Sequence, residues 1–506
     1  MKKILQLTIA VFALTATSGA FGQQRYWDEI FTDVDVDTSV QYGTNISVLT
    51  GAPASQNLKM DVYSPSGDNV TSRPLIVYLH TGSFLPYPVN GTCSGSRKDS
   101  ATVEMCTRFA KRGYVVAAIS YRLGWNPVSG DQDVRTSTLI NAVYRGLQDA
   151  HNAVRFFRYD ADSLANSYGI NPGKIIVGGQ GSGGYLANAY STLNDTTEIY
   201  LDKFTNATTG VPYINTAYSG DFEGFGSIPG SPLNLENLPG INSEVQFIFN
   251  MGGALGDSTW LEGNEPPMVA FHVPNDPFAP YGFGSVIVPT TGDFVVEVSG
   301  SYEAIRLAND SSNQDVFDNV LFNDPYTARA MAALNPSNAA TNLNGLPVSQ
   351  LEGLFPFVRP TAESAPWEWW DPNCPNNTNS LLTNPDMSKT KALAYIDSIQ
   401  GYLAPRIVCA LQLGGCQYIG VEENNAQESV LVYPNPATGI FTVSGFENGN
   451  NIRSIRMFDL AGRTIINEFN LNTSKLSIDG NAFAPGVYFM NIDLDKGSVS
   501  TKVVIE

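Results

Sequence analysis

The sequence predicts an α/β fold, a mostly parallel sheet covered by helices, followed by a small all-β sandwich domain. Residues 74–79, 114–119 and 174–178 form short apolar runs that are continuous rather than alternating, which is typical of strands buried on both faces. Residues 143–157 carry apolar side chains at a spacing of three or four, along one helical face. Strands that alternate with helices in this way form mostly parallel sheets. From residue 430 the chain shows short alternating strands separated by turns, which predicts the all-β domain.

Other segments extend this pattern. Residues 45–49 and 58–63 alternate between apolar and polar side chains, as half-buried antiparallel strands do. Further strands are predicted at residues 245–249, 268–272 and 294–298. The Asn- and Pro-rich segment that follows predicts helices at residues 326–334 and 389–403.

The length and charge of the chain limit the possible classes. A chain of 506 residues exceeds one ordinary core, so two or more domains are expected. Its 43% apolar and 15% charged residues fit a folded globular protein. The formal net charge of −19 repels nucleic-acid phosphates and anionic membrane surfaces. We therefore expect no nucleic-acid partner and interpret the charge as a source of solubility at a crowded cell surface.

The N-terminus predicts export. Two lysines precede an apolar stretch at residues 4–16, and residues 20–22 have the small-x-small pattern of a signal-peptidase site. We predict a signal peptide at residues 1–22 and cleavage between Gly22 and Gln23. No later stretch is long enough to predict a transmembrane anchor. The protein is expected to pass through the periplasm and to be extracellular or at the outer cell surface.

Five cysteines follow the predicted signal peptide. In an oxidising compartment their short spacings favour two local disulfides, Cys93 with Cys106 and Cys409 with Cys416. Each bridge would contribute very roughly 2–3 kcal/mol, and Cys374 is left unpaired. No Cys/His spacing resembles a zinc site, so no metal and no cofactor are expected.

Four motifs mark the C-terminal domain. They lie at residues 433–439, 457–463, 484–488 and 502–506. In this order they resemble the type A sorting domain of the type IX secretion system, a Gram-negative export route. The resemblance implies a sorting domain at residues 430–506 that binds the secretion machinery and carries no catalysis. The polar residues 417–429 are the predicted linker.

The residues after the first buried strand, Leu79-His80-Thr81-Gly82-Ser83-Phe84, are similar to the His-Gly-Gly loop of one branch of esterases. In that loop small residues let backbone N–H groups point at an oxyanion. Strings at residues 121–123, 148–150 and 153–156 also match this branch, as do the late strand and turn at 268–277. The large domain, residues 23–416, is therefore identified as an α/β-hydrolase-like, carboxylesterase-like domain, with the resemblance covering residues 42–298.

This resemblance implies roles for several residues. His80, Gly82 and Ser83 take oxyanion-loop positions, and Asp276 takes the position of the triad acid. The N–H groups of Gly82, of Ser83 and of the helix after Gly181 would converge on an anion site. A small-molecule or surface ligand in the hydrolase pocket is expected to be the partner.

The segment that should carry the nucleophile departs from the family pattern. The family has Gly-Gly-x-Ser-Ala-Gly-Gly at the turn between a strand and a helix. Aligned without gaps, Gly179 and Gly183 take the flanking glycines, Gly181 takes the nucleophile position, and Ser182 follows it. A slip of one residue would make Ser182 the nucleophile, but would place Gln180 where close packing favours glycine.

The histidines also limit catalysis. The chain has three, His80, His151 and His272, whereas the base of a hydrolase triad follows the acid in chain order. No histidine follows Asp276. We interpret His80 as a loop hydrogen-bonding residue, His151 as a helix surface or interface residue, and His272 as structural.

Three functions remain open at this stage. The first is a catalytically degenerate esterase-like surface protein that binds a ligand or has a structural role. The second is an active carboxylesterase-like serine hydrolase that uses Ser182 with Asp276 and an unrecognised base. The third is an adhesin that retains only the fold. The tryptophans at residues 367–370 offer stacking surface, although packing explains any single one equally well.

Overall fold

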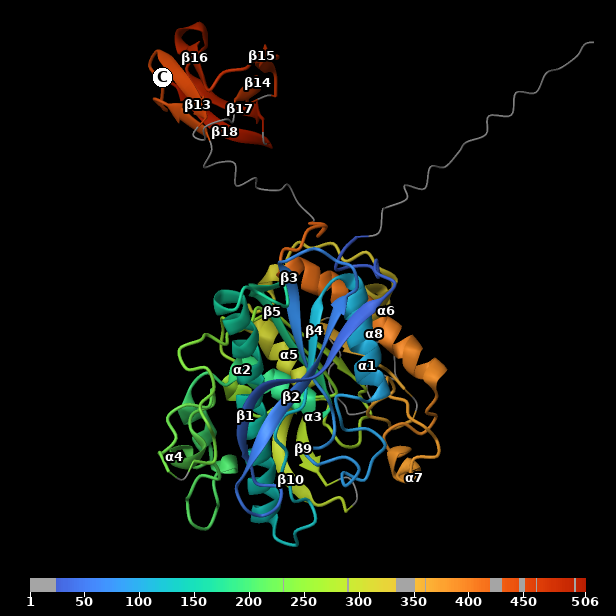
Figure 1. The fold of residues 1–506 in the computed structure, drawn as a ribbon. Coiled ribbons are helices and arrows are strands. Elements are labelled where there is room, and N and C mark those ends of the chain that lie inside the picture. The colour runs from blue at the N-terminus through green and yellow to red at the C-terminus, as the bar shows by residue number, and fades with distance from the viewer. Residues whose placement is uncertain are drawn as a thin grey trace, which may run out of the picture. The chain divides into compact units, whose positions relative to one another are not determined.

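The computed structural model describes residues 24–230, 232–288, 291–333, 351–359, 361–418, 430–445, 451–460, 462–495 and 497–506. Its chain divides into two compact units, Met1–Gln417 and Tyr418–Glu506 (Figure 1). The predicted signal peptide, its cleavage point after Gly22, and residues 419–429 of the predicted linker lie outside the described residues.

A mixed sheet forms the centre of the large unit. Within the described residues it has eight strands in the order β1-β2-β4-β3-β5-β6-β8-β11. The strands are β1 (Val34–Ser47), β2 (Ala54–Pro65), β3 (Arg73–Leu79), β4 (Val115–Ile119), β5 (Ile170–Gln180), β6 (Phe247–Met251), β8 (Met268–His272) and β11 (Leu354–Pro356). From β4 to β11 neighbouring strands are parallel, and β1 and β2 add an antiparallel edge. The predicted sheet and its antiparallel N-terminal strands are therefore confirmed.

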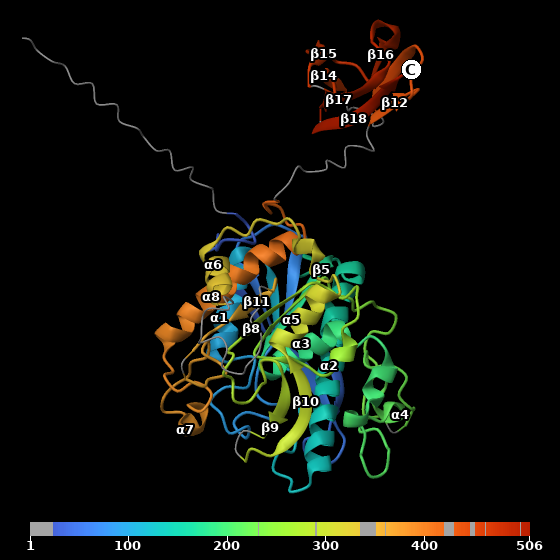
Figure 2. The same cartoon turned by 180° about the vertical axis from the view of Figure 1, so that it is seen from behind.

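Helices cover both faces of this sheet (Figures 1 and 2). They are α1 (Ser100–Arg112), α2 (Gln132–Ser163), α3 (Ser182–Thr192), α5 (Ser301–Asp310), α6 (Pro325–Ala333) and α8 (Lys389–Ala410), with single turns at α4 (Thr216–Ser219) and α7 (Asn377–Ser380). Side chains along β3 alternate between two cores, one on each face of the sheet. Val77 packs with α2, α3 and α5, whereas Ile76 and Tyr78 pack with α1 and α8. None of the helices in the described parts of the chain is long and apolar enough to cross a membrane.

One predicted strand lies outside the central sheet. The run at residues 294–298 belongs to β10 (Phe294–Gly300), which pairs antiparallel with β7 (Ala254–Leu255) and β9 (Phe283–Ile287). Phe294 and Glu297 of β10 are exposed, and its other five residues are buried.

The C-terminal unit consists of two antiparallel sheets around their own core. The strands are β12 (Val430–Tyr433), β13 (Ile440–Gly445), β14 (Ile452–Asp459), β15 (Thr464–Glu468), β16 (Lys475–Asp479), β17 (Gly486–Leu494) and β18 (Gly497–Ile505). Phe441 and Val443 of one sheet pack in a cluster with Met457 and Met490 of the other. This is the predicted all-β domain.

The disulfides differ from the predicted pairing. The structure has the expected bridge between Cys409 and Cys416, but Cys93 is bonded to Cys374 and Cys106 is a buried free thiol. The predicted Cys93–Cys106 bridge is therefore wrong. Cys106 lies on the face of α1 that packs into the core, whereas Cys93 lies in a loop that contacts Ser380 through its backbone N–H.

Candidate active site

The turn between β5 and α3 centres on Gly181. Its backbone has φ 53° and ψ −121°, a conformation that residues with a Cβ adopt only under strain. Gly179 and Gly183 flank it in close contact, since a Cβ on Gly179 would lie 2.6 Å from the backbone of Gly183. A Cβ on Gly183 would lie 2.1 Å from the carbonyl oxygen of Leu79. In an α/β-hydrolase a sharp strand-to-helix turn of this kind carries the nucleophile.

Thr81 occupies the space beside this turn. The parallel pairing of Leu79 with Gly179 brings the ends of β3 and β5 together. A Cβ built on Gly181 would lie 2.3 Å from Oγ1 and 3.1 Å from Cβ of Thr81. A side chain at position 181 therefore requires Thr81 to move, and sequence reasoning missed this contact.

Ser182 is the first residue of α3 and is buried. Its Oγ lies 3.1 Å from the hydroxyl of Tyr121, which donates a hydrogen bond to the carbonyl of His80 at 2.7 Å. Because that Tyr121 proton is directed at His80, the Ser182 hydroxyl donates to the tyrosine oxygen. Burial raises the pKa of Tyr121, so its phenol remains neutral and does not act as a base for Ser182.

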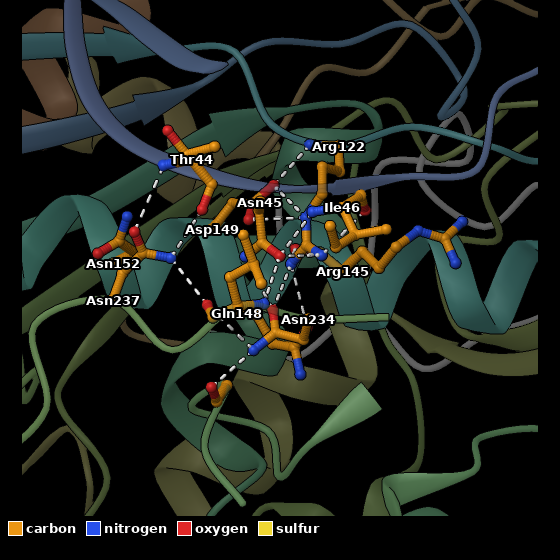
Figure 3. Close-up of polar contacts among 12 residues, drawn as sticks. Thr44, Asn45, Ile46, Arg122, Arg145, Gln148, Asp149, Asn152, Asn234 and Asn237 are labelled. Carbon is orange, nitrogen blue, oxygen red and sulfur yellow. Dashed lines mark hydrogen bonds and ion pairs between the residues drawn. The ribbon is translucent and has the colours of Figure 1, made fainter. Parts of the chain in front are cut away.

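A buried polar network fixes the segment that carries Tyr121 (Figure 3). Arg122 and Asp149 are both fully buried and form an ion pair at 2.9 Å. The same guanidinium donates to Asn45 at 2.9 Å and to Asn234 at 3.0 Å. Figure 3 shows these side chains converging on Arg122 from several separate segments, α2 among them. The network is a structural support, because its donors and acceptors are paired with one another.

Asp276 lies in the turn after β8, and its side chain is buried. Its Oδ1 accepts hydrogen bonds from the backbone N–H groups of Phe278 and Ala279 at 2.8 and 3.0 Å, and from Oγ of Ser364 at 2.7 Å. Its Oδ2 has no hydrogen bond to the described residues and lies 3.9 Å from Nε2 of His272. Burial raises the pKa of Asp276 to about 7 despite these donors.

Ser364 lies in the segment that follows the last strand, β11. A triad base comes from the loop at this point of the fold and donates a hydrogen bond to the acid. Ser364 donates a hydrogen bond to Asp276 from this segment. Sequence reasoning missed this residue because no local pattern marks it.

The three histidines are buried and neutral near pH 7. Burial lowers the pKa of both His80 and His272 to about 4, and that of His151 well below its usual range. His272 lies between Oγ of Ser301 at 2.8 Å and the carbonyl of Ala279 at 3.1 Å. His151 stacks on a tyrosine ring at 4.0 Å, so the prediction that it lies on the helix surface or at an interface is wrong.

A cavity of about 280 Å³ opens at this turn. It brings together five of the predicted site residues, Gly82, Ser83, Gly181, Ser182 and Asp276, whereas His80 is absent from the described lining. Most of its wall is apolar and includes Leu139, Val143 and Leu147 of α2 together with Val286, Val296 and Val298 of β9 and β10. A largely apolar pocket with a few polar groups is typical of a small-molecule site.

Glu368 is a second buried carboxyl in the cavity wall. It accepts hydrogen bonds from Oγ of Ser94 at 2.9 Å and from Nε2 of Gln180 at 3.1 Å. Burial raises the pKa of Glu368 to about 8. The Cys93–Cys374 disulfide joins the two wall segments on either side of this contact. Among the described residues that line the cavity, none is lysine, arginine or histidine.

The strand order and the turn at Gly181 define the large unit as an α/β-hydrolase domain. Two parts of the chain match family models: residues 60–219 match the BD-FAE family, and residues 431–506 match the family described as secretion system C-terminal sorting domain. The chain therefore has an esterase-like α/β-hydrolase domain followed by a sorting domain of the type IX secretion system, and it is a secreted protein.

Solved structures of a thermophilic esterase from Thermogutta terrifontis, esterase 2, are similar to this chain. The native form is 17% identical, and the match covers 79% of this chain and 99% of that one with a TM-score of 0.37. The form phosphorylated by paraoxon is 20% identical, with 50% and 74% covered and a TM-score of 0.30. No match was found among curated protein sequences.

Proposed function

We propose that the hydrolase domain of this secreted protein does not hydrolyse esters and instead binds an apolar ligand in the cavity beside Gly181. The observation that carries this proposal is the contact at the turn. Gly181 supplies no nucleophile, and Thr81 fills the space that a nucleophile side chain would need. Ser364 in place of a base supports the same conclusion, because a serine hydroxyl does not accept a proton near pH 7.

The alternative function is an active hydrolase that uses Ser182. Ser182 lies within α3 rather than at the turn, and its hydroxyl contacts Tyr121. Asp276 accepts its hydrogen bonds from Ser364 and two backbone N–H groups, whereas Nε2 of His272 lies 3.9 Å from its Oδ2 and is bonded to the carbonyl of Ala279. Neither residue is thus joined to a group that could act as a general base, which a serine nucleophile requires.

The ligand-binding part of the proposal rests on the shape and chemistry of the cavity. Its wall is mainly aliphatic and aromatic, and its carboxyl groups are Asp276 and Glu368. At about 280 Å³ it is close to the lower end of small-molecule sites, which span roughly 300–1,000 Å³. An apolar molecule with one polar group fits this lining.

Two measurements test the proposal on the purified protein. Hydrolysis of short-chain nitrophenyl esters should not exceed the blank, and a fluorophosphonate probe should label no serine. Nile red, a neutral apolar dye, should bind saturably, with increased fluorescence. Substitution of Leu147 by aspartate should weaken dye binding, whereas the exposed Leu164→Asp should not. Stoichiometric labelling of Ser182 would establish the active hydrolase instead.

A further inference from the structure

The described lining of the cavity carries acidic groups without a basic one. Its two carboxyl side chains are Asp276 and Glu368, and no described lining residue carries a positive charge. Burying carboxyl groups without a cation is costly, and the raised pKa of each group reflects that cost. A ligand that supplies the missing positive charge would offset it.

Asp276 has an acceptor atom available for such a ligand. Three donors point at Oδ1, whereas Oδ2 has no hydrogen bond to the described residues. Nε2 of His272 lies 3.9 Å from Oδ2 and is neutral near pH 7, because burial lowers the pKa of that imidazole to about 4. Both oxygens of Glu368, by contrast, have hydrogen-bond partners.

We propose that the cavity takes an apolar ligand carrying a primary amine, with the ammonium group at Oδ2 of Asp276 and the chain along the aliphatic wall. This proposal rests on the proposed function, since it names the chemical class of the ligand of that site. It also replaces the anion site expected at Gly82 and Ser83. Backbone N–H groups there offer only partial charges, whereas two carboxyls repel an anion with full charges once they ionise.

The test compares three probes that share one chain and differ in the head group: decylamine, decanol and decanoate. Each displaces Nile red from the intact protein at pH 8, below its own micelle concentration. Decylamine should bind about tenfold or more tightly than decanoate, with decanol between them. Tighter binding of decanol or decanoate than of decylamine overturns the proposal. Ester hydrolysis by the protein, or no binding of any probe or of Nile red, would instead refute the proposed function.

Two variants locate the head group. Asp276→Asn keeps Oδ1 as an acceptor for its three donors and removes the charge, so it should weaken decylamine binding about tenfold and leave decanol within about twofold. Asp35→Asn, at an exposed position on β1, is the matched control and should leave all three affinities unchanged. An Asp276→Asn variant that binds decanol normally and still prefers decylamine tenfold over decanoate overturns the assignment to Asp276.

Discussion

Replacing Gly181 with serine tests the geometry of the turn directly. The backbone at φ 53° and ψ −121° carries a strain of about 1–3 kcal/mol for a residue with a Cβ. The new Cβ would also lie 2.3 Å from Oγ1 of Thr81, and overpacking of this kind costs about 1–3 kcal/mol. We therefore expect Gly181→Ser to lower the free energy of unfolding by about 3 kcal/mol.

The two contributions can be separated by a double-mutant cycle in urea. Thr81→Ala removes Oγ1, so Gly181→Ser should cost about 1–2 kcal/mol less in that background. Ser182→Ala is the matched control and should stay within about 1 kcal/mol of the wild type, because Tyr121 keeps its hydrogen bond to His80. None of the variants should hydrolyse nitrophenyl esters. If Gly181→Ser unfolds like the wild type while Ser182→Ala abolishes a measurable hydrolysis, the nucleophile is Ser182 and our account of the turn fails.

Three further results are expected. The pKa of Asp276 is raised from 3.8 to about 7, so the folded state favours the neutral carboxyl and the wild type loses stability as pH rises from about 4 to 7. Between pH 4 and pH 8 the free energy of unfolding of Asp276→Asn, measured in urea, should therefore increase by roughly 4 kcal/mol relative to that of the wild type. Peptide mapping without reduction should recover Cys93 joined to Cys374 and Cys106 as a free thiol; a Cys93–Cys106 peptide would contradict this. Deletion of residues 430–506 should retain a folded hydrolase domain in the periplasm, and normal export of the truncated protein would refute the sorting role.

The central sheet was predictable because burial on two faces leaves a clear pattern. The runs at residues 74–79, 114–119 and 174–178 correspond to β3, β4 and β5, whose side chains divide between two cores. The run at residues 294–298 is also mostly apolar, yet it lies in a separate antiparallel sheet. A short apolar run indicates a strand but does not identify its neighbours, since pairing depends on contacts far along the chain.

The disulfide pairing and the contacts at the site also depend on residues that are far apart in the sequence. The short spacing of Cys93 and Cys106 suggested a disulfide between them. Cys106 is buried in α1, however, and Cys93 is bonded to Cys374, which lies 281 positions further along the chain. Thr81 lies in the predicted oxyanion loop, yet its contact with Gly181 depends on the register of β3 against β5. Glu368 lies in the tryptophan-rich segment at residues 367–370, whose composition alone did not distinguish packing from a pocket wall.

The residues that depart from the hydrolase family pattern are compatible with one another. Gly181 relaxes the turn, and the side chain of Thr81 takes the space that glycine leaves free. Ser364 donates to Oδ1 of Asp276, as an imidazole would, but cannot shuttle a proton near pH 7. Restoring the family residue at one position therefore creates a conflict at another. A serine at position 181 would collide with Thr81, and without that collision it would still lack a general base. Under the proposed function, a hydrolase would need changes at Gly181, Thr81 and Ser364 together, whereas binding in the cavity would need none.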